Sequence, residues 1–416
     1  MRILVTAAGS RGDVAPYTGV AAGLREAGHE VVLAAPETFA GLVAGSGAVF
    51  HGLPADPRAP VTDRPAAGGE GTAALMRRAR AFLGDLGGGL ADAAALHRPD
   101  LMVLSTTTAP LGWHVAEALG TPTLGAYLQP VAPTRDFPPV VGGGRALGGW
   151  GNRAAGRLAL RVVDRIHADA VEGLRRRLDL PAAAAGAVRR RVEGSGWPVL
   201  HGFSPTMVPR PGDWRDGLEV VGAWWPHVPE SYRLPDAVED FLRAGPPPVF
   251  VGFGSMGGGQ GERLGELVVR ALRQAGVRGV VQAGWAGLGA GDGGRDDVLA
   301  VGDVPHAVLF PRTAAVVHHA GAGTAAAAVR AGVPSVPVPF TADQPFWARR
   351  LAALGAGTEP VPVTSLTAEG LAEAIRRAVT EPSYRERAAL AAARMRREDG
   401  VGAVVAKVSR VASVRG

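Results

Sequence analysis

The sequence contains no cysteine, and its 416 residues include a single lysine, Lys407. The missing thiols exclude disulfides, thiolate metal ligands and cysteine nucleophiles, and they favour a protein of the reducing cytoplasm. Nearly all positive charge is arginine spread thinly along the chain, so the formal net charge of +6 is weak support for a nucleic-acid partner. The one dense basic run, residues 189–191, has no interleaved aromatic residues, and a solvated helix face explains it better than a nucleic-acid patch.

Long apolar runs are absent as well. None reaches the roughly 18 residues that a membrane-spanning helix needs. Residues 3–5 read as a buried strand directly after Met1 and Arg2, without the charged and apolar regions of a signal peptide. We therefore expect no transmembrane segment and a cytoplasmic location. The excess of Arg, Ala, Gly and Pro is typical of GC-rich, actinobacterial coding.

Metal-binding patterns are also missing. The sequence has no Asp-x-Asp pair and no His/Glu cluster at the spacing of metal ligands. We therefore expect no metal and no other cofactor.

Strands alternate with helices along the chain, a pattern that predicts an α/β fold with doubly wound parallel sheets. A strand at residues 3–5 and a helix at residues 14–27 open one such series, and a strand at residues 248–255 opens another. We therefore predict two Rossmann-like halves that face a cleft. The predicted segments are a domain at residues 1–208, a linker at 209–247, a second domain at 248–383, and a helical segment at 384–416 that can pack back on the first domain.

Residues 318–324, HHAGAGT, read as the end of a buried strand, a glycine turn and the opening of a helix. Gly321 and Gly323 lack the Cβ that would keep a ligand from the backbone, and the helix offers unpaired N–H groups and a positive dipole end. The Thr324 hydroxyl and a ring N–H of His319 can point at phosphate oxygens. The alternative is structural, with Thr324 as a helix cap and the glycines as a turn.

Asp343 and Gln344 follow the next strand, on the carboxyl edge where ligands of open α/β sheets bind. An adjacent carboxylate and carboxamide accept from and donate to vicinal hydroxyls, the pattern that a hexose presents. A simple helix cap at Asp343 is the alternative.

Together, VGDVPH at 301–306, HHAGAGT at 318–324 and the Asp343-Gln344 pair resemble the donor signature of family 1 glycosyltransferases of the GT-B fold. The sequence is most similar to the bacterial natural-product and sterol glycosyltransferases. The resemblance covers nearly the whole chain, since it includes GSRGD at 9–13, FSP at 203–205 and GSM at 254–256. It implies an N-terminal acceptor-binding domain and a C-terminal nucleotide-sugar-binding domain.

The resemblance also implies roles for the donor-site residues. His319 and the turn after it contact the donor diphosphate, Ser255 reaches it from a facing loop, and Asp343 with Gln344 holds the sugar hydroxyls. The region of Trp285 and the main chain of Val304 frame the base. His306 beside them is explained equally well by packing. The donor-binding residues expected on this basis are Ser10, Ser255, Trp285, Val304, His319, Gly321, Gly323, Thr324, Asp343 and Gln344.

Asp13 is the candidate catalytic base. Inverting transfer needs a group that takes the proton of the acceptor hydroxyl as its oxygen attacks the anomeric carbon. Asp13 lies at the first strand-to-helix turn, and similar enzymes place a His or an Asp there, the glycopeptide and sterol enzymes with the same SRGD. An N-cap is the structural alternative. Many similar enzymes pair a His base with an Asp on a later loop, but residues 105–108 offer only hydroxyls, so no dyad is expected.

The predicted function is metal-independent, inverting transfer of a hexose from a UDP- or dTDP-sugar to a hydroxyl of a lipophilic natural product, such as a polyketide, a macrolide antibiotic or a sterol-like alcohol. The hydroxyl-binding pair Asp343-Gln344 favours UDP-glucose. The acceptor is expected under the Gly- and Pro-rich loops at 54–72 and 140–151. Its candidate contacts, for which core packing is the alternative, are Trp113, Phe137 and Trp150.

Four other functions are less well supported. A NAD-dependent oxidoreductase needs Gly-x-Gly-x-x-Gly, but residues 9–12 read GSRG, and Glu37 lies late for a ribose contact. A hydrolase at Ser255 lacks the first glycine of the nucleophile elbow. A GT-B epimerase needs further acid and base carboxylates. The fourth alternative is a catalytically idle GT-B protein that binds a nucleotide sugar or supports a partner enzyme. This hypothesis gives no role to Asp13.

Overall fold

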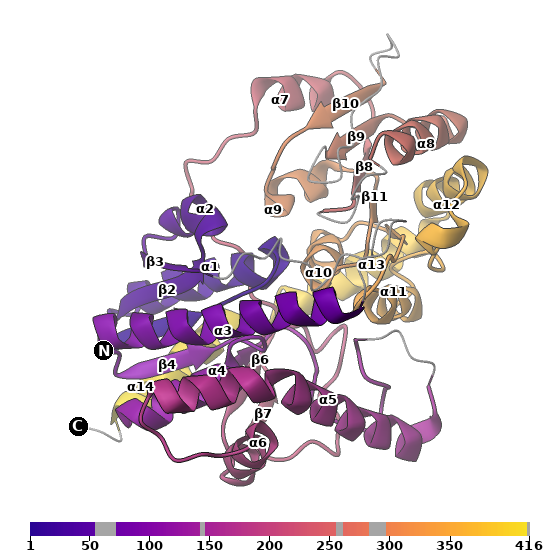
Figure 1. Cartoon of the computed structure of the whole chain (residues 1–416). Coiled ribbons are helices and arrows are strands. Elements are labelled where there is room, and N and C mark those ends of the chain that lie inside the picture. Colours follow the sequence, from indigo (N-terminus) through magenta and orange to yellow (C-terminus); the bar gives the residue numbers. More distant parts are fainter. Residues whose placement is uncertain (55–71, 142–145, 255–260, 283–296, 414–416) are drawn as a thin grey trace.

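The structure is a computed structural model that describes residues 1–54, 72–141, 146–254, 261–282 and 297–413. They form two α/β units, which lie one above the other in Figure 1. Each unit is built on a sheet in which all paired strands run parallel. Parallel strands need crossover connections that return the chain to the same edge, which is why a helix follows most strands.

The first sheet has seven strands in the order β3-β2-β1-β4-β5-β6-β7. The order reverses beside β1, which pairs with β2 on one side and with β4 on the other. Such a reversal opens a crevice at the carboxyl ends of the strands. The strands are β1 (Arg2–Thr6), β2 (Glu30–Pro36), β3 (Val49–Leu53), β4 (Leu101–Leu104), β5 (Thr123–Tyr127), β6 (Val199–His201) and β7 (Leu218–Val220).

Helices cover both faces of the first sheet, because successive residues of a strand point to opposite sides. Ile3 and Val5 pack with α1 on one face, and Leu4 packs with α3 and α4 on the other. The helices of this unit are α1 (Arg11–Glu26), α2 (Ala40–Ala44), α3 (Thr72–His97), α4 (Ala109–Leu119), α5 (Gly148–Arg177) and α6 (Ala185–Gly194), with a 3₁₀ turn at Glu37–Phe39.

The second sheet has five strands in the order β10-β9-β8-β11-β12, and it reverses beside β8. Val251 packs with α8 and α12 on one face, and Phe250 packs with α7 and α10 on the other. Its strands are β8 (Val249–Gly252), β9 (Gly279–Gln282), β10 (Val298–Val301), β11 (Ala315–His318) and β12 (Ser335–Pro337). Its helices are α7 (Asp236–Arg243), α8 (Gly261–Ala275), α9 (His306–Leu309), α10 (Ala322–Ala331), α11 (Gln344–Ala353) and α12 (Ala368–Thr380), with 3₁₀ turns at Phe310–Arg312 and Val363–Ser365.

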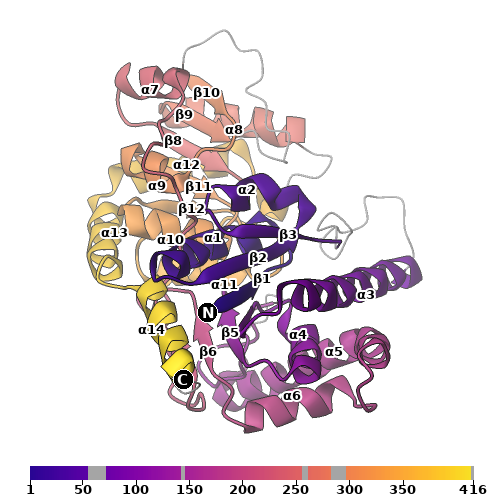
Figure 2. The ribbon, with the colours of Figure 1, turned by 90° about the vertical axis from the view of Figure 1, so that its left-hand side faces the viewer.

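After the second sheet the chain returns to the first unit. Helix α13 (Pro382–Met395) packs on α10, and α14 (Gly400–Ser413) packs on α1, close to the N-terminus in Figure 2. Trp224 fixes this return, because its Nε1 donates to the Gly400 carbonyl at 3.0 Å. The expected linker, residues 209–247, contains β7 and α7, so regular structure occupies part of it.

Aromatic side chains join the two units. Phe203 lies 6.0 Å from Trp347 and Phe137 lies 5.3 Å from Phe346, measured between ring centroids. These rings belong to one hydrophobic cluster that contains residues of both units. The predicted fold of two doubly wound parallel-sheet domains is thus confirmed.

Candidate active site

The loops at the carboxyl ends of the two sheets contact each other. Gln129, just beyond β5, donates from Nε2 to Asp343 Oδ2 at 3.4 Å, and Asp343 lies beyond β12. Arg11 at the start of α1 forms an ion pair with Asp303 beyond β10, at 3.0 Å. The two crevices predicted by strand order therefore face each other, and the candidate residues Asp13 and Asp343 lie beside this line of contact.

Asp13 is held at the first turn of α1. Its Oδ2 accepts hydrogen bonds from the Ser10 amide at 2.8 Å and from Ser10 Oγ at 2.9 Å. Gly9 has φ of +132°, and a Cβ there would lie 2.5 Å from Asp13 Oδ2, so the turn requires glycine. Ser10 thus orients the carboxylate. Among the described residues, Asp13 Oδ1 has no hydrogen-bond partner and is free to take a proton.

The surroundings of Asp13 raise its pKa above the ordinary value. Burial is the largest cause, the two hydrogen bonds from Ser10 oppose it, and the negative charge of Asp343 across the cleft adds to it. A carboxylate that has lost solvent and faces a second carboxylate binds a proton more readily. This is the change that general-base catalysis by a carboxylate needs.

A small cavity lies against Asp13. Its volume is about 10 Å³, room for about one water molecule or one hydroxyl group. Its lining combines the carboxylate with hydroxyl and amide groups from the loops after β4 and β5. The lining residues are Ala8, Asp13, Tyr17, Ser105, Thr106, Thr107, Leu128 and Gln129.

Two hydroxyl groups of the loop after β4 form hydrogen bonds within the protein that hold the loop in place. Thr108 Oγ1 lies 2.7 Å from Thr6 Oγ1 and 3.1 Å from Ser105 Oγ, and all three side chains are buried. These groups are therefore satisfied within the protein. No histidine is among the residues that line the cavity beside Asp13.

The HHAGAGT segment forms a strained turn between β11 and α10. His318 is fully buried, and its Nδ1 accepts from the Ala320 amide at 3.1 Å. Ala320 has φ of +62°, a left-handed conformation that costs an alanine free energy and that often marks functional sites. Because α10 begins directly after the turn, its first amides, those of Gly323 and Thr324 among them, lie at the carboxyl edge of the second sheet. No heavy atom would lie within 4 Å of a Cβ on Gly323, so a ligand can approach the backbone there.

Glycines make room for the His319 ring. A Cβ on Gly321 would lie 2.5 Å from His319 Nε2, and one on Gly254 would lie 3.2 Å from Cε1. Burial lowers the pKa of His319 to about 4, and the main chain of Gly252 opposes this shift. The ring is therefore neutral near pH 7. A neutral imidazole offers an anion one N–H donor rather than a positive charge.

Asp343 and Gln344 begin α11. Asp343 Oδ2 accepts from Trp347 Nε1 at 2.9 Å, and burial raises the pKa of Asp343. Gln344 Oε1 accepts from the amides of Phe340 and Thr341, at 2.8 and 3.1 Å. The side-chain carbonyl of Gln344 therefore stabilises the loop that precedes α11. Only the NH₂ group of the Gln344 side chain is left for a ligand. Asp343 keeps Oδ1 without a partner among the described residues.

The remaining donor-site candidates are Ser255, expected at the diphosphate, and Trp285 and Val304, expected at the nucleobase. Ser255 and Trp285 lie outside the described residues. Val304 is buried in the cluster that contains Phe310. His306 stacks on Phe310, with ring centroids 4.3 Å apart and an interplanar angle of 13°, and burial lowers its pKa to about 4. These contacts favour the packing role for His306.

The three candidate acceptor contacts lie in different surroundings. Trp113 is buried against Trp197, with ring centroids 5.2 Å apart, and Phe137 is buried at the contact between the units. Trp150 is 81% exposed at the start of α5. Core packing explains the burial of Trp113 and Phe137. Acceptor binding by any of the three side chains stays a prediction.

Sequence reasoning missed Gln129, the residue that contacts Asp343. A signal was present, because Gln129 is a polar residue directly after the buried strand β5, at the carboxyl edge of the sheet. Its partner lies 214 residues further along the chain.

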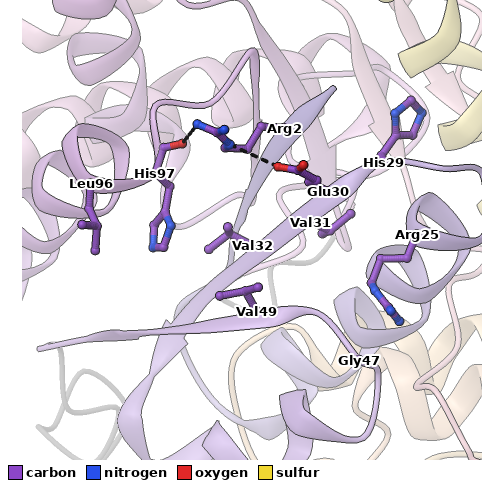
Figure 3. Close-up of a pocket in the computed structure, with 10 residues that line it drawn as sticks. All are labelled: Arg2, Arg25, His29, Glu30, Val31, Val32, Gly47, Val49, Leu96 and His97. Atoms are coloured by element: carbon purple, nitrogen blue, oxygen red, sulfur yellow. Dashed lines mark hydrogen bonds and ion pairs between the residues drawn. The ribbon is translucent and has the colours of Figure 1, made fainter.

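A cavity of about 530 Å³ lies on the other side of the first unit (Figure 3). It opens at the amino ends of β1 and β2, away from the edge where ligands of such sheets bind. Arg2 on its wall already donates to the His97 carbonyl at 2.9 Å and to Glu30 at 3.3 Å. The cleft, and not this cavity, is therefore the candidate active site.

Two further observations concern metals and membranes. Among the described residues, no three His, Asp or Glu side chains are grouped to hold a metal ion. Within the same residues, no helix is both long and apolar enough to cross a bilayer.

Comparisons with known proteins match both halves of the chain. Residues 3–137 match the glycosyltransferase family 28 N-terminal domain, and residues 295–409 match the C-terminal domain of erythromycin biosynthesis protein CIII-like proteins. O-mycaminosyltylonolide 6-deoxyallosyltransferase of Streptomyces fradiae is 37% identical over 93% of this chain and 92% of its own length. A sterol 3-beta-glucosyltransferase of Arabidopsis thaliana is 33% identical over 97% of this chain, which spans only 64% of that relative.

Solved structures agree on the fold. The glycosyltransferase of kitacinnamycin superposes with a TM-score of 0.73 at 20% identity, over 99% of this chain and 98% of the other. Glycosyltransferase VinC, solved in complex with dTDP, gives a TM-score of 0.69 at 23% identity over the full length of both chains. The chain therefore belongs to the GT-B glycosyltransferases, in the group of bacterial natural-product and sterol enzymes that its sequence resembles.

Proposed function

We propose that this protein transfers a hexose from a nucleoside-diphosphate sugar to a hydroxyl group of a lipophilic natural product, with inversion and without a metal ion or other cofactor. The observation that carries the proposal is the placement of Asp13. Its carboxylate has a raised pKa, lies against a cavity the size of one hydroxyl group and faces the donor-side carboxylate of Asp343. A base on one side of a cleft and an anion site on the other are the two parts that sugar transfer needs.

The reaction is a single displacement. The acceptor oxygen attacks the anomeric carbon, and its proton passes to Asp13 Oδ1, which has no other partner among the described residues. The bond between that carbon and the diphosphate oxygen breaks as the new C–O bond forms. Attack opposite the leaving group inverts the configuration of the sugar.

The leaving nucleoside diphosphate carries the charge that the protein must stabilise. The N-terminus of α10 supplies free amides and a positive dipole end, and Thr324 adds a hydroxyl. His319, neutral near pH 7, adds one ring N–H. Preorganised donors of this kind lower the barrier most where charge develops.

The residues that we expect to hold the sugar, Asp343 and Gln344, indicate which donor the protein uses. Asp343 retains one free carboxylate oxygen and Gln344 one amide group, which favours a sugar with vicinal hydroxyls such as glucose. The names of the relatives leave the nucleotide open, since one is a sterol glucosyltransferase and another a deoxyallosyltransferase. Glycosyltransferase VinC was solved with dTDP, which supports the thymidine nucleotide as an alternative. We therefore favour UDP-glucose and keep a dTDP-sugar as the second donor.

Mass spectrometry of the purified protein tests the proposal directly. Hydrophobic alcohols, macrolides and sterols are incubated with UDP-glucose and, in parallel, with a dTDP-sugar, with and without EDTA. We expect an acceptor that gains one hexose, unaffected by EDTA, and an NMR coupling that reports inversion. Nucleotide binding without transfer to any acceptor would instead assign an idle GT-B protein. A retained configuration would refute the single displacement.

A further inference from the structure

Helix α5 carries apolar side chains on its solvent-exposed face. Leu158, Val162 and Ile166 are 59%, 50% and 41% exposed, and Trp150 at the start of the helix is more exposed still. The opposite face of α5 packs on α3 and α4, and α6 packs alongside (Figure 1). The exposed apolar residues are therefore not part of the core of the first unit.

Arginines lie among these apolar residues. Leu158, Val162 and Ile166 follow one another at intervals of four residues, so they form one row along the helix. Arg157, Arg161 and Arg165 each precede one of them and form a parallel row, and all three are exposed. Neither an ion pair nor a hydrogen bond engages these three guanidinium groups within the part of the chain that the structure describes.

The acidic residues of α5 do not neutralise this face. Asp164 pairs with Arg189 of α6 at 2.8 Å, Asp169 with Arg80 of α3 at 3.0 Å, and Glu172 with Arg176 at 2.8 Å. Each carboxylate thus has a cationic partner, and the arginine row keeps its charge. We name this surface the α5 face: Trp150, Arg157, Leu158, Arg161, Val162, Arg165 and Ile166.

We propose that the α5 face binds an anionic lipid surface. Aliphatic side chains enter the boundary between headgroups and acyl chains, tryptophan prefers that same depth, and arginines donate to lipid phosphates. A nucleic acid fits this face less well, because Trp150 is the one ring of the face on which a base could stack, and its other apolar side chains are aliphatic. The mixture of aliphatic and cationic rows is the composition of helices that lie flat on membranes.

The N-terminal turns of α5 are fixed to the segment that reaches the second unit. Asn152 Nδ2 donates to the Arg135 carbonyl at 3.1 Å, and a Cβ on Gly156 would lie 3.0 Å from Pro133. Phe137, close by in sequence, packs on Phe346 of the second unit. A lipid surface that holds α5 would therefore hold the acceptor-side unit beside the cleft. This goes beyond the proposed transfer, since binding needs neither donor nor acceptor.

Vesicle sedimentation tests the proposal with the full-length protein. We expect partition onto vesicles of phosphatidylcholine with one third phosphatidylglycerol, weak partition onto pure phosphatidylcholine, and release at high salt because Debye screening weakens the attraction. The triple variant R157Q/R161Q/R165Q should lose at least tenfold in partition coefficient, since each arginine near an anionic surface contributes separately. The matched control is R394Q/R396Q/R397Q, which removes the same charge from exposed positions at the end of α13 and beyond. It should stay within twofold of the unchanged protein.

A second variant tests the apolar row. L158S/V162S should also lower partition at least fivefold, with an unchanged melting temperature, because both side chains are solvent-exposed in the free protein. No partition of the unchanged protein, or equal losses in the two arginine triples, would overturn the proposal. So would a dimer in sedimentation velocity that the α5 variants dissociate while vesicle binding is absent, which would assign the face to a second copy of the chain. A failed sugar-transfer assay leaves these binding results intact.

Discussion

Gln129 Nε2 donates a hydrogen bond to Asp343 Oδ2 across the cleft, at 3.4 Å. Asp343 Oδ2 also accepts from Trp347 within its own unit, so one oxygen of the carboxylate is held from both sides. The other oxygen, Oδ1, is free among the described residues and is the one that a sugar hydroxyl can reach. The first unit therefore helps to orient the carboxylate that we assign to the donor.

Replacing Gln129 by leucine should weaken donor binding. Without the amide, Asp343 keeps only the bond from Trp347 and loses part of its orientation, so the donor KM should rise about threefold to tenfold, the effect of one modest hydrogen bond to a charged group. Steady-state kinetics with varied UDP-glucose measures this. Gln274→Leu removes a comparable bond, to Glu369 at 3.5 Å, far from the cleft and should leave KM unchanged. Equal KM values for both variants would refute the orienting role of Gln129.

The parts of the site that the sequence predicted are local. In GSRGD and in HHAGAGT, a strand, a glycine turn and a helix follow one another directly, so the placement of Asp13 and His319 follows from their neighbours. The partnership of Gln129 with Asp343 depends on how two units meet, and no local pattern contains it. Trp113 illustrates another limit: an aromatic residue on an apolar helix suits a core and a pocket equally, and only its packing on Trp197 distinguishes them.

Gln344 and α5 show two further features of the structure that could not be predicted from the sequence. A carboxamide after a strand has the chemistry of a sugar ligand, but the Gln344 carbonyl accepts from amides three and four residues earlier. That choice depends on the left-handed backbone of Ala342, at φ of +56°, which composition does not reveal. The spacing of Arg157, Arg161 and Arg165 is readable from the sequence. The exposure of the aliphatic residues beside them depends on where α3, α4 and α6 pack.

Asp13→Asn should lower kcat about 100-fold or more while donor affinity stays the same, because the acceptor proton loses its base. Calorimetry with UDP and single-turnover kinetics measure the two effects. The melting temperature at pH 7 should be unchanged or higher. The folded-state pKa of Asp13 is raised, so stability is lost as the pH rises from the ordinary 3.8 through the folded-state pKa, and asparagine removes this cost. If Asp13 only completes the capping box at the N3 position of α1, turnover should be near normal, since the side-chain carbonyl of asparagine can accept from the same Ser10 amide.

The pH profile of kcat/KM should carry an acid limb set by Asp13. The enzyme needs the ionised base, so the rate falls as the pH drops through a pKa above the ordinary 3.8. Asp343→Asn should move this limb to lower pH, because it removes the negative charge that helps to raise the pKa of Asp13. Asp240→Asn, on the exposed side of α7, is the matched control and should leave the limb in place. A limb that does not move in Asp343→Asn would show that the two carboxylates are not coupled.

His319→Ala should weaken the binding of UDP about tenfold to 100-fold, as expected for a hydrogen bond to a charged group. Isothermal titration calorimetry measures the affinity without any acceptor. His306→Phe is the companion variant, because phenylalanine can keep the stack on Phe310, and it should bind UDP normally if His306 only packs. Unchanged affinity in His319→Ala would remove His319 from the diphosphate site.

Gly9→Ala separates backbone strain from contact with the base. At φ of +132° an alanine is strained, and its Cβ would lie 2.5 Å from Asp13 Oδ2. Strain of this kind costs about 1–3 kcal/mol of stability. Gly28→Ala is the control, because Gly28 has φ of +86° at the end of α1 but no heavy atom within 4 Å of the added Cβ. Both variants should unfold more easily in urea, and only Gly9→Ala should lose turnover, at least tenfold, because its methyl group displaces the carboxylate. Equal turnover in the two variants would show that catalysis does not depend on where the Asp13 carboxylate lies.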